Sequence, residues 1–118
     1  MNQENKKYHC HFELTLDIIG GKWKPLILFY IGKNNVLRYG EIKKHIPNIN
    51  ERMLTRQLRE LEKADLINRK VYPVVPPKVE YSLTKEGKSL LPILDELQAW
   101  GVDYNHKMNI AKFIGIKE

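Results

Sequence analysis

The stretch from Asn50 to Ala64 limits the folds open to this chain more than any other segment. Its leucines, Leu54, Leu58 and Leu61, recur at the spacing of one helix face, and Asn50 in front of them is a favourable N-cap. An advance of about 100° per residue places basic residues on the opposite face. These residues, called the basic ridge below, are Arg52, Arg56, Arg59 and Lys63. The sequence therefore predicts a helix with one side in a core and a cationic side facing outward.

Two strands with a stiff connection follow this helix. Apolar and polar side chains alternate over residues 67–72 and 78–83, as they do in strands. Residues 73–77 between them include three prolines, which lack the N–H donor needed for regular pairing. We therefore expect a hairpin whose tip projects.

Shorter elements precede the helix at 50–64. Apolar spacing predicts a first helix that ends at the pair Gly20-Gly21 and a second helix from near Lys22. A short strand at 36–38 and a helix at 39–45 come next. A helix, a turn, a capped helix and a two-stranded wing in this order predict a winged helix-turn-helix, whose second helix enters the major groove of DNA.

The last apolar stripe is longer than a small domain needs. Thr84 is a good N-cap for it, and Pro92 is expected to kink the helix or to restart it near Leu91. Because the stripe continues to Met108, after the domain is complete, a partner helix is expected to cover it. The predicted dimer interface consists of Phe12, Leu16, Leu94, Leu97, Trp100 and Tyr104.

Length and charge are consistent with one small DNA-binding domain. The chain has 118 residues, with 20 Lys+Arg and 14 Asp+Glu, a net charge of +6. We expect a single, mainly α domain over 1–118 with a small β-hairpin wing, an ordered core over about 10–108, and flexible tails at 1–8 and 109–118. No leader or membrane-spanning apolar run is evident, so a cytoplasmic location and no membrane partner are expected.

The basic ridge suits double-stranded DNA as the partner. Guanidinium groups fork onto guanine edges or phosphates, and Asn50 and Thr55 near the helix start can reach bases or phosphate. Arg38 and Lys78 are expected to contact the flanking DNA backbone. Two other interpretations are a solvated basic face and an interaction module for an acidic protein. An RNA-binding platform would need more sheet, with exposed aromatics.

Several short motifs together resemble the HxlR-type family of bacterial winged-helix transcription regulators. They are Gly20-Gly21-Lys22-Trp23, Leu37-Arg38-Tyr39-Gly40-Glu41-Ile42, Met53-Leu54-Thr55, Leu58-Arg59-Glu60-Leu61-Glu62, Tyr72-Pro73, Pro76-Pro77-Lys78-Val79-Glu80-Tyr81 and Leu83-Thr84-Lys85-Glu86-Gly87. The resemblance covers roughly residues 10–104. It implies a homodimer held by the N- and C-terminal helices, bound to an inverted repeat near a promoter, with repression as the favoured outcome.

The chain departs from the usual family pattern at two places. His11 follows Cys10 where proline is common, and Ala64-Asp65 stands where an Asp-Gly pair often ends the recognition helix. The second departure requires Asp65 to adopt a left-handed conformation, which Asp tolerates better than most residues.

Cys10 is the candidate regulatory residue. It lies at the start of the first helix, near Lys6, Lys7 and two histidines, and both a helix N-terminus and positive charge stabilise a thiolate. In relatives that sense oxidants or electrophiles, the resemblance implies, a cysteine at this position does the sensing. The alternatives are a small apolar residue in a dimer interface and control by an unknown small-molecule effector.

Metal binding and catalysis find no support in the sequence. The run His9-Cys10-His11 does not converge on one ion from a helix, and no further ligand follows at useful spacing. A nucleophile with a base, a carboxylate pair and a phosphate loop are all absent from the motifs. We expect no metal, no cofactor and no enzymatic activity.

Overall fold

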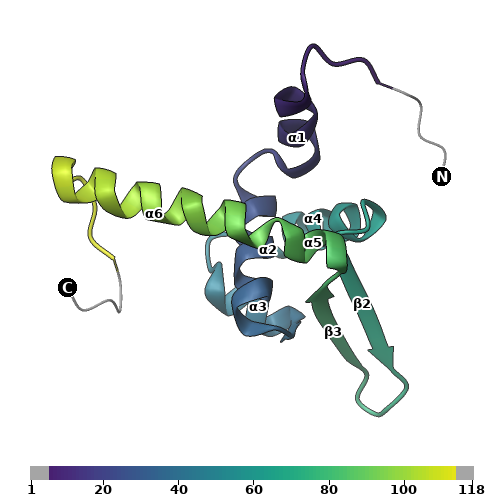
Figure 1. The fold of residues 1–118 in the computed structure, drawn as a ribbon. Helices are drawn as coiled ribbons and strands as arrows, with labels where there is room; N and C mark the ends of the chain where they lie inside the picture. The colour runs from purple at the N-terminus through teal and green to yellow at the C-terminus, as the bar shows by residue number, and fades with distance from the viewer. Residues whose placement is uncertain (1–5, 114–118) are drawn as a thin grey trace.

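Residues 6–113 are described by the computed structural model. They form a group of helices with a small sheet at one side, and a hairpin and two helices extend outward (Figure 1). In chain order the elements are α1 (His11–Ile19), α2 (Trp23–Asn34), β1 (Leu37–Arg38), α3 (Tyr39–His45), α4 (Glu51–Lys63), β2 (Ile67–Tyr72), β3 (Lys78–Leu83), α5 (Lys85–Ser89) and α6 (Leu91–Met108). The predicted mainly α, winged helix-turn-helix architecture is confirmed.

Helix α2 forms the centre of the core. Its Ile27, Leu28 and Ile31 are fully buried, and the predicted leucine seam of α4 is buried as well. Gly32 lets α6 approach α2 closely, because a Cβ at this position would lie 2.3 Å from Cδ2 of Leu91. The core therefore joins the helix-turn-helix to the first turns of α6.

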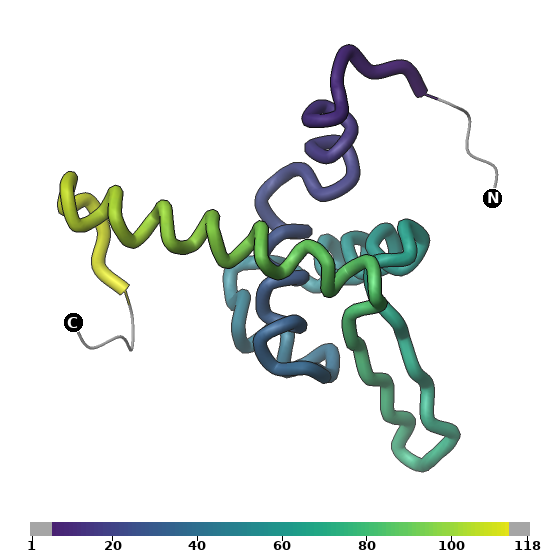
Figure 2. The backbone as a smooth tube through the Cα atoms, viewed as in Figure 1, coloured from purple at the N-terminus to yellow at the C-terminus, as the bar shows by residue number. Residues whose placement is uncertain are grey.

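The sheet is antiparallel, with the strand order β1-β3-β2. In the β2–β3 ladder Ile67 pairs with Leu83 and Tyr72 with Lys78, and both strands match their predicted bounds. The hairpin of β2 and β3 extends away from the body of the molecule (Figure 2). This is the wing, and its base continues into the core through Tyr81 and Leu83.

The last helix begins again at Leu91, as the position of Pro92 predicts. Thr84 Oγ1 accepts a hydrogen bond from the Gly87 amide at 3.0 Å and caps α5, which ends at Ser89. Because α6 begins at Leu91, Pro92 falls in its first turn, where a missing N–H leaves no hydrogen bond unmade. Asp65 has φ 62, so the predicted left-handed conformation is confirmed.

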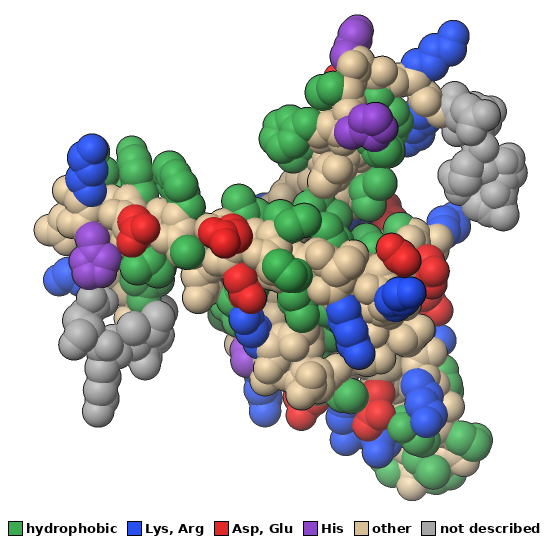
Figure 3. Space-filling model, viewed as in Figure 1, with side chains coloured by type: hydrophobic (Ala, Val, Ile, Leu, Met, Phe, Trp, Pro, Cys, Tyr) green, Lys and Arg blue, Asp and Glu red, His purple; other side chains and the backbone are tan. Residues whose placement is uncertain are grey.

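Two helices carry apolar side chains away from the body. The exposed ones on α1 and α6 include Phe12, Leu16, Leu97, Trp100 and Tyr104, and Figure 3 shows hydrophobic side chains gathered along both helices. Leu94 was wrongly predicted to lie in the dimer interface, since it is only 4% exposed and belongs to the core of its own chain. The reason is that the first turns of α6 pack on α2, so the stripe leaves the body only after Leu94.

The predicted tails lie partly outside the described residues, at 1–5 and 114–118. In the described parts, Lys6 Nζ lies 3.3 Å from Asp17 Oδ2, and the Tyr8 hydroxyl donates to the same carboxylate. The amides of Ile110 and Ala111 donate to Asn105 Oδ1 at 3.0 and 2.9 Å. Within residues 6–113, no helix has both the length and the apolar character needed to cross a membrane.

Candidate nucleic-acid interface

The turn between α3 and α4 orients the predicted recognition helix, α4. Ile46 and Ile49 in this turn are buried, so the turn is fixed from the core side. Asn50 Oδ1 accepts the Met53 amide at 2.8 Å, which is the predicted N-cap. The cap uses one lone pair of the carboxamide oxygen of Asn50 and leaves its NH2 group outside this hydrogen bond.

The basic ridge lies on the outward face of α4, opposite the buried leucines. All four of its side chains are exposed. Arg52, Arg56 and Arg59 line one shallow concavity together with Thr55, Glu51 and Glu60, whereas Lys63 lies one turn further along the helix. The structure thus brings three ridge arginines around Thr55 and places Lys63 at the end of the row.

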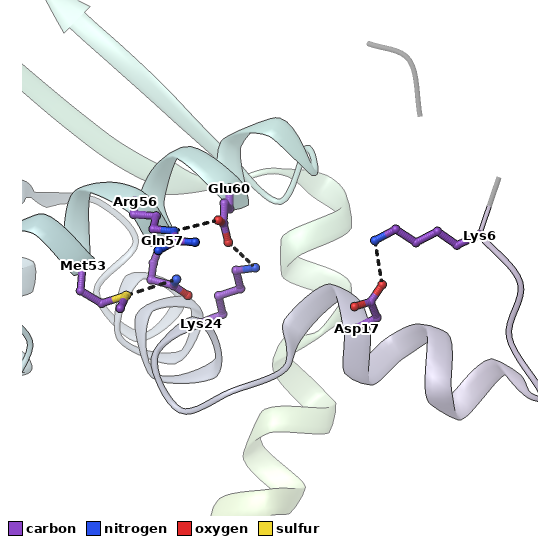
Figure 4. A network of polar contacts seen from close by, with 7 residues as sticks. All are labelled: Lys6, Asp17, Lys24, Met53, Arg56, Gln57 and Glu60. Carbon is purple, nitrogen blue, oxygen red and sulfur yellow. Dashed lines mark hydrogen bonds and ion pairs between the residues drawn. The ribbon is translucent and has the colours of Figure 1, made fainter. Parts of the chain in front are cut away.

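Glu60 is a carboxylate beside the basic ridge, and its role was not predicted from the sequence. Its Oε1 lies 2.8 Å from Lys24 Nζ of α2, and its Oε2 lies 3.5 Å from Arg56 Nε (Figure 4). The hydrogen bond from Lys24, and then Arg56, lowers the pKa of Glu60 below its usual value. The i,i+4 spacing could have indicated the Arg56 pair, but no sequence spacing relates Glu60 to Lys24.

Tyr39 connects the two helices of the motif and was also missed. Its hydroxyl donates to the Glu51 carbonyl oxygen at 3.0 Å and lies 3.1 Å from Thr55 Oγ1. Thr55 is half-buried, between the ridge and the wing. A second concavity, between α4 and the wing, is lined by Tyr39, Thr55, Leu58, Arg59, Glu62, Arg69, Val79 and Tyr81. Arg69 therefore lies beside the basic ridge, and only the strand register, which pairs it with Tyr81, places it there. The basic ridge, Arg69 and the basic residues of the wing are called the cationic surface below.

The wing holds its lysines against an aromatic ring. Lys70 Nζ and Lys78 Nζ lie 4.9 and 4.6 Å from the centroid of the Tyr72 ring. The Tyr72 hydroxyl donates to Glu80 at 2.9 Å, and Glu80 lies 3.4 Å from Lys78. That hydrogen bond from Tyr72, and then Lys78, lowers the pKa of Glu80. Lys78 is thus oriented beside its own strand.

Two predicted residues lie away from this surface or at its edge. Arg38 is exposed at the N-cap of α3, where its backbone amide donates to Glu41 Oε1 at 2.8 Å. Cys10 is an exposed free cysteine at the N-cap of α1, the position that the sequence predicts. Within the described residues no three His, Cys, Asp or Glu side chains gather closely enough to hold a metal ion.

Known proteins are similar to this chain in sequence and in fold. The family model of HxlR-like helix-turn-helix proteins matches residues 18–109. An uncharacterized HTH-type transcriptional regulator of Methanothermobacter thermautotrophicus is 55% identical over 104 residues, which cover 87% of this chain and 79% of that protein.

Two solved structures are similar to this one. The redox regulator HypR in its oxidized form is 51% identical, with a TM-score of 0.74 over 80% of this chain and 96% of that chain. Diamide-treated YodB from Bacillus subtilis is 32% identical, with a TM-score of 0.65 over 83% of this chain and 97% of that chain.

Proposed function

The chain belongs to the HxlR-like helix-turn-helix family of transcriptional regulators, and from this premise we propose that it is a homodimeric, sequence-specific DNA-binding protein that represses transcription. The observation that carries the proposal is the basic ridge, which faces outward on a capped helix beside a basic wing. Repression is favoured by the family resemblance alone. The protein acts by binding, without catalysis.

Each part of the cationic surface has a role in this proposal. Helix α4 enters the major groove, where Arg52, Arg56 and Arg59 reach base edges or phosphates. Asn50 and Thr55 contact the DNA at the helix start, and Lys63 contacts phosphate at its end. Arg38 and Lys78 contact the backbone on either side and set the register of α4 on the duplex.

The exposed apolar faces of α1 and α6 support a dimer. Phe12 is 70% exposed and Trp100 is 64% exposed, although both are large apolar side chains. Trp100 stacks on Tyr104 with ring centroids 4.7 Å apart, which gives α6 a rigid aromatic surface. A two-fold pair would present its recognition helices to an inverted repeat, with half-sites about 34 Å apart or a small multiple of that.

DNA binding is tested by titration of the purified protein with its own upstream DNA and with random duplex. We expect a footprint on an inverted repeat, a steep fall of affinity with salt, and tighter binding to the footprinted site than to random DNA. Equal affinity for both duplexes would contradict sequence-specific binding. In that case an acidic protein partner would become the better proposal for this surface.

Thiol regulation is the second part of the proposal. It is supported by the similarity to a redox regulator and to a diamide-treated relative, and by the exposed position of Cys10. Oxidation of two Cys10 thiols by diamide would transfer two electrons and two protons to the diamide and form a disulfide between subunits. A tenfold change in operator affinity requires about 1.4 kcal/mol of difference between the two states.

This regulation is tested with wild type and Cys10→Ser, each with and without diamide. We expect diamide to change operator binding by the wild type only. Identical binding in all four conditions would make Cys10 structural and would leave a small-molecule effector as the source of the signal.

A further inference from the structure

A chain of hydroxyl groups runs from the recognition helix into the helix before it. The Tyr39 hydroxyl lies 3.0 Å from the Glu51 carbonyl oxygen and 3.1 Å from Thr55 Oγ1. A carbonyl oxygen can only accept, so the single phenolic hydrogen of Tyr39 is donated to Glu51. The 3.1 Å contact is a hydrogen bond at the same time only if the Tyr39 oxygen accepts the hydrogen of the Thr55 hydroxyl.

This arrangement fixes the polarity of Thr55. A threonine hydroxyl has one hydrogen and two lone pairs. With the hydrogen directed at Tyr39, Oγ1 can offer only a lone pair to anything else. Phosphate oxygens accept hydrogen bonds only, so Thr55 in this state cannot bind the DNA backbone through its hydroxyl.

Thr55 is placed where base edges would lie. It is half-buried, it shares one concavity with Arg52, Arg56 and Arg59, and it shares the other with Arg59 and Arg69 of the wing. In the major groove the base donors are the N6 amino group of adenine and the N4 amino group of cytosine. Guanine and thymine present a carbonyl oxygen instead.

We propose that Thr55 is a specificity-determining acceptor for the amino group of an adenine or cytosine, and that Tyr39 is the positioning residue that imposes this polarity. The inference rests on the proposed DNA-binding function and names what one position of α4 reads. In Tyr39→Phe the ring is kept but the acceptor for Thr55 is lost. The Thr55 hydroxyl is then free to donate, and guanine, thymine and phosphate become acceptable partners.

The experiment measures affinity for the footprinted site and for each of its single base-pair variants. Thr55→Val identifies the base pair read by Thr55, because discrimination there is lost. At this base pair we expect wild type to prefer adenine or cytosine on the contacted strand by roughly three- to tenfold, the range of one net hydrogen bond. Thr55→Ser keeps the hydroxyl and should keep the preference.

Tyr39→Phe should lose this preference at the same base pair only. Its salt dependence and its discrimination at the other positions serve as matched readouts and should follow wild type, while thermal unfolding should show only the small loss that comes from the missing hydrogen bond to Glu51. A chemical test uses the footprinted site with purine in place of a contacted adenine, which removes the amino group alone. Purine should weaken binding by wild type but not by Thr55→Val.

The outcomes separate this inference from the proposed function. If wild type discriminates among duplexes but prefers guanine or thymine at the Thr55 position, the polarity is wrong. If Tyr39→Phe keeps the wild-type preference, Tyr39 is only structural. If wild type shows no discrimination between its site and random DNA, the proposed function itself fails.

Discussion

Asn50 and Thr55 each use part of their hydrogen-bonding capacity within the fold. Asn50 Oδ1 holds the Met53 amide, and the Thr55 hydroxyl is engaged by Tyr39. In the proposed complex with DNA, Thr55 would therefore offer an acceptor, whereas Asn50 would still offer its NH2 donors and the second lone pair of its oxygen. Two short side chains at the start of one helix are thus expected to bind different groups.

Arg56 and Lys78 are predicted to differ in what they contribute to DNA binding. Arg56 lies on the outward face of α4, so Arg56→Ala should cost on the order of 1–3 kcal/mol on the specific site and relax base preference. Lys78 lies on the wing, so Lys78→Ala should weaken binding to all sequences alike and reduce the salt slope by about one. Salt titrations on the specific site and on random duplex measure both, and equal losses on both duplexes for the two variants would refute this division.

Glu60 is predicted to lower the affinity for DNA while it stabilises the fold. Glu60→Gln removes a negative charge beside Arg56, so affinity for random duplex at low salt should rise. Glu62→Gln, also on α4 but outside this ion pair, is the matched control, and an equal gain from both substitutions would mean that only net charge matters.

The ion pairs of Glu60 also predict how the stability of the fold depends on pH. The pKa of Glu60 is lowered in the folded protein, so the ionised carboxylate stabilises the fold at pH values above the ordinary pKa of 4.5. This contribution should be lost as the pH falls from about 4.5 through the lowered pKa. Because Glu60 is 43% exposed, we expect Glu60→Gln to lose less than about 1 kcal/mol at pH 7. Urea unfolding at pH 7 and pH 3 should show the difference from wild type shrinking at the lower pH.

At the scale of elements, local sequence patterns predicted the bounds of strands and helices, because nearby residues determine them. The alternation at 78–83 and the prolines at 73–77 matched β3 and the end of β2, and Pro92 marked the start of α6 because its ring excludes it from a helix interior. Helix periodicity alone could not show which turns another helix covers. Leu94 and Leu97 belong to one apolar stripe, yet Leu94 is buried in the core whereas Leu97 is 60% exposed.

The candidate site was predictable only in part for the same reason. The basic ridge follows from the spacing within one helix. Tyr39 and Lys24 lie on other elements, and only the packing of α3 and α2 against α4 brings them to Thr55 and Glu60. Arg69 reaches the surface through strand register, which a one-residue shift would reverse.

The contact between α5 and the loop before β2 depends on a missing side chain. A Cβ on Gly87 would lie 2.1 Å from the backbone oxygen of Leu66, which already accepts the Thr84 amide at 3.1 Å. Gly87→Ala should therefore destabilise the fold by about 1–3 kcal/mol, as overpacking does. Gly40→Ala is the control, because nothing lies within 4 Å of its Cβ in α3, and it should be neutral or stabilise by up to about 1 kcal/mol. Urea unfolding measures both, and equal effects would exclude the contact as the cause.

At the scale of the whole molecule, α1 and α6 leave the body in different directions with their apolar sides uncovered by it (Figure 1). Exposed apolar faces of this kind mark association surfaces, so they support the proposed homodimer. The recognition helices of two copies would then be spaced by how α6 packs, and any change at this interface would alter DNA binding.

Leu97 tests this dimer because it is 60% exposed in the single chain. In a monomer Leu97→Asp would place a charge in water and change little, whereas in a dimer it would place an unpaired charge in an apolar interface. We therefore expect Leu97→Asp to sediment as a monomer or to aggregate, and to bind the inverted repeat weakly. Gln98→Asp adds the same charge about 100° around α6, away from the row of Leu97, Trp100 and Tyr104, and should remain dimeric. A wild type that sediments as a monomer at micromolar concentration while it binds its site tightly would show that α1 and α6 do not form the interface.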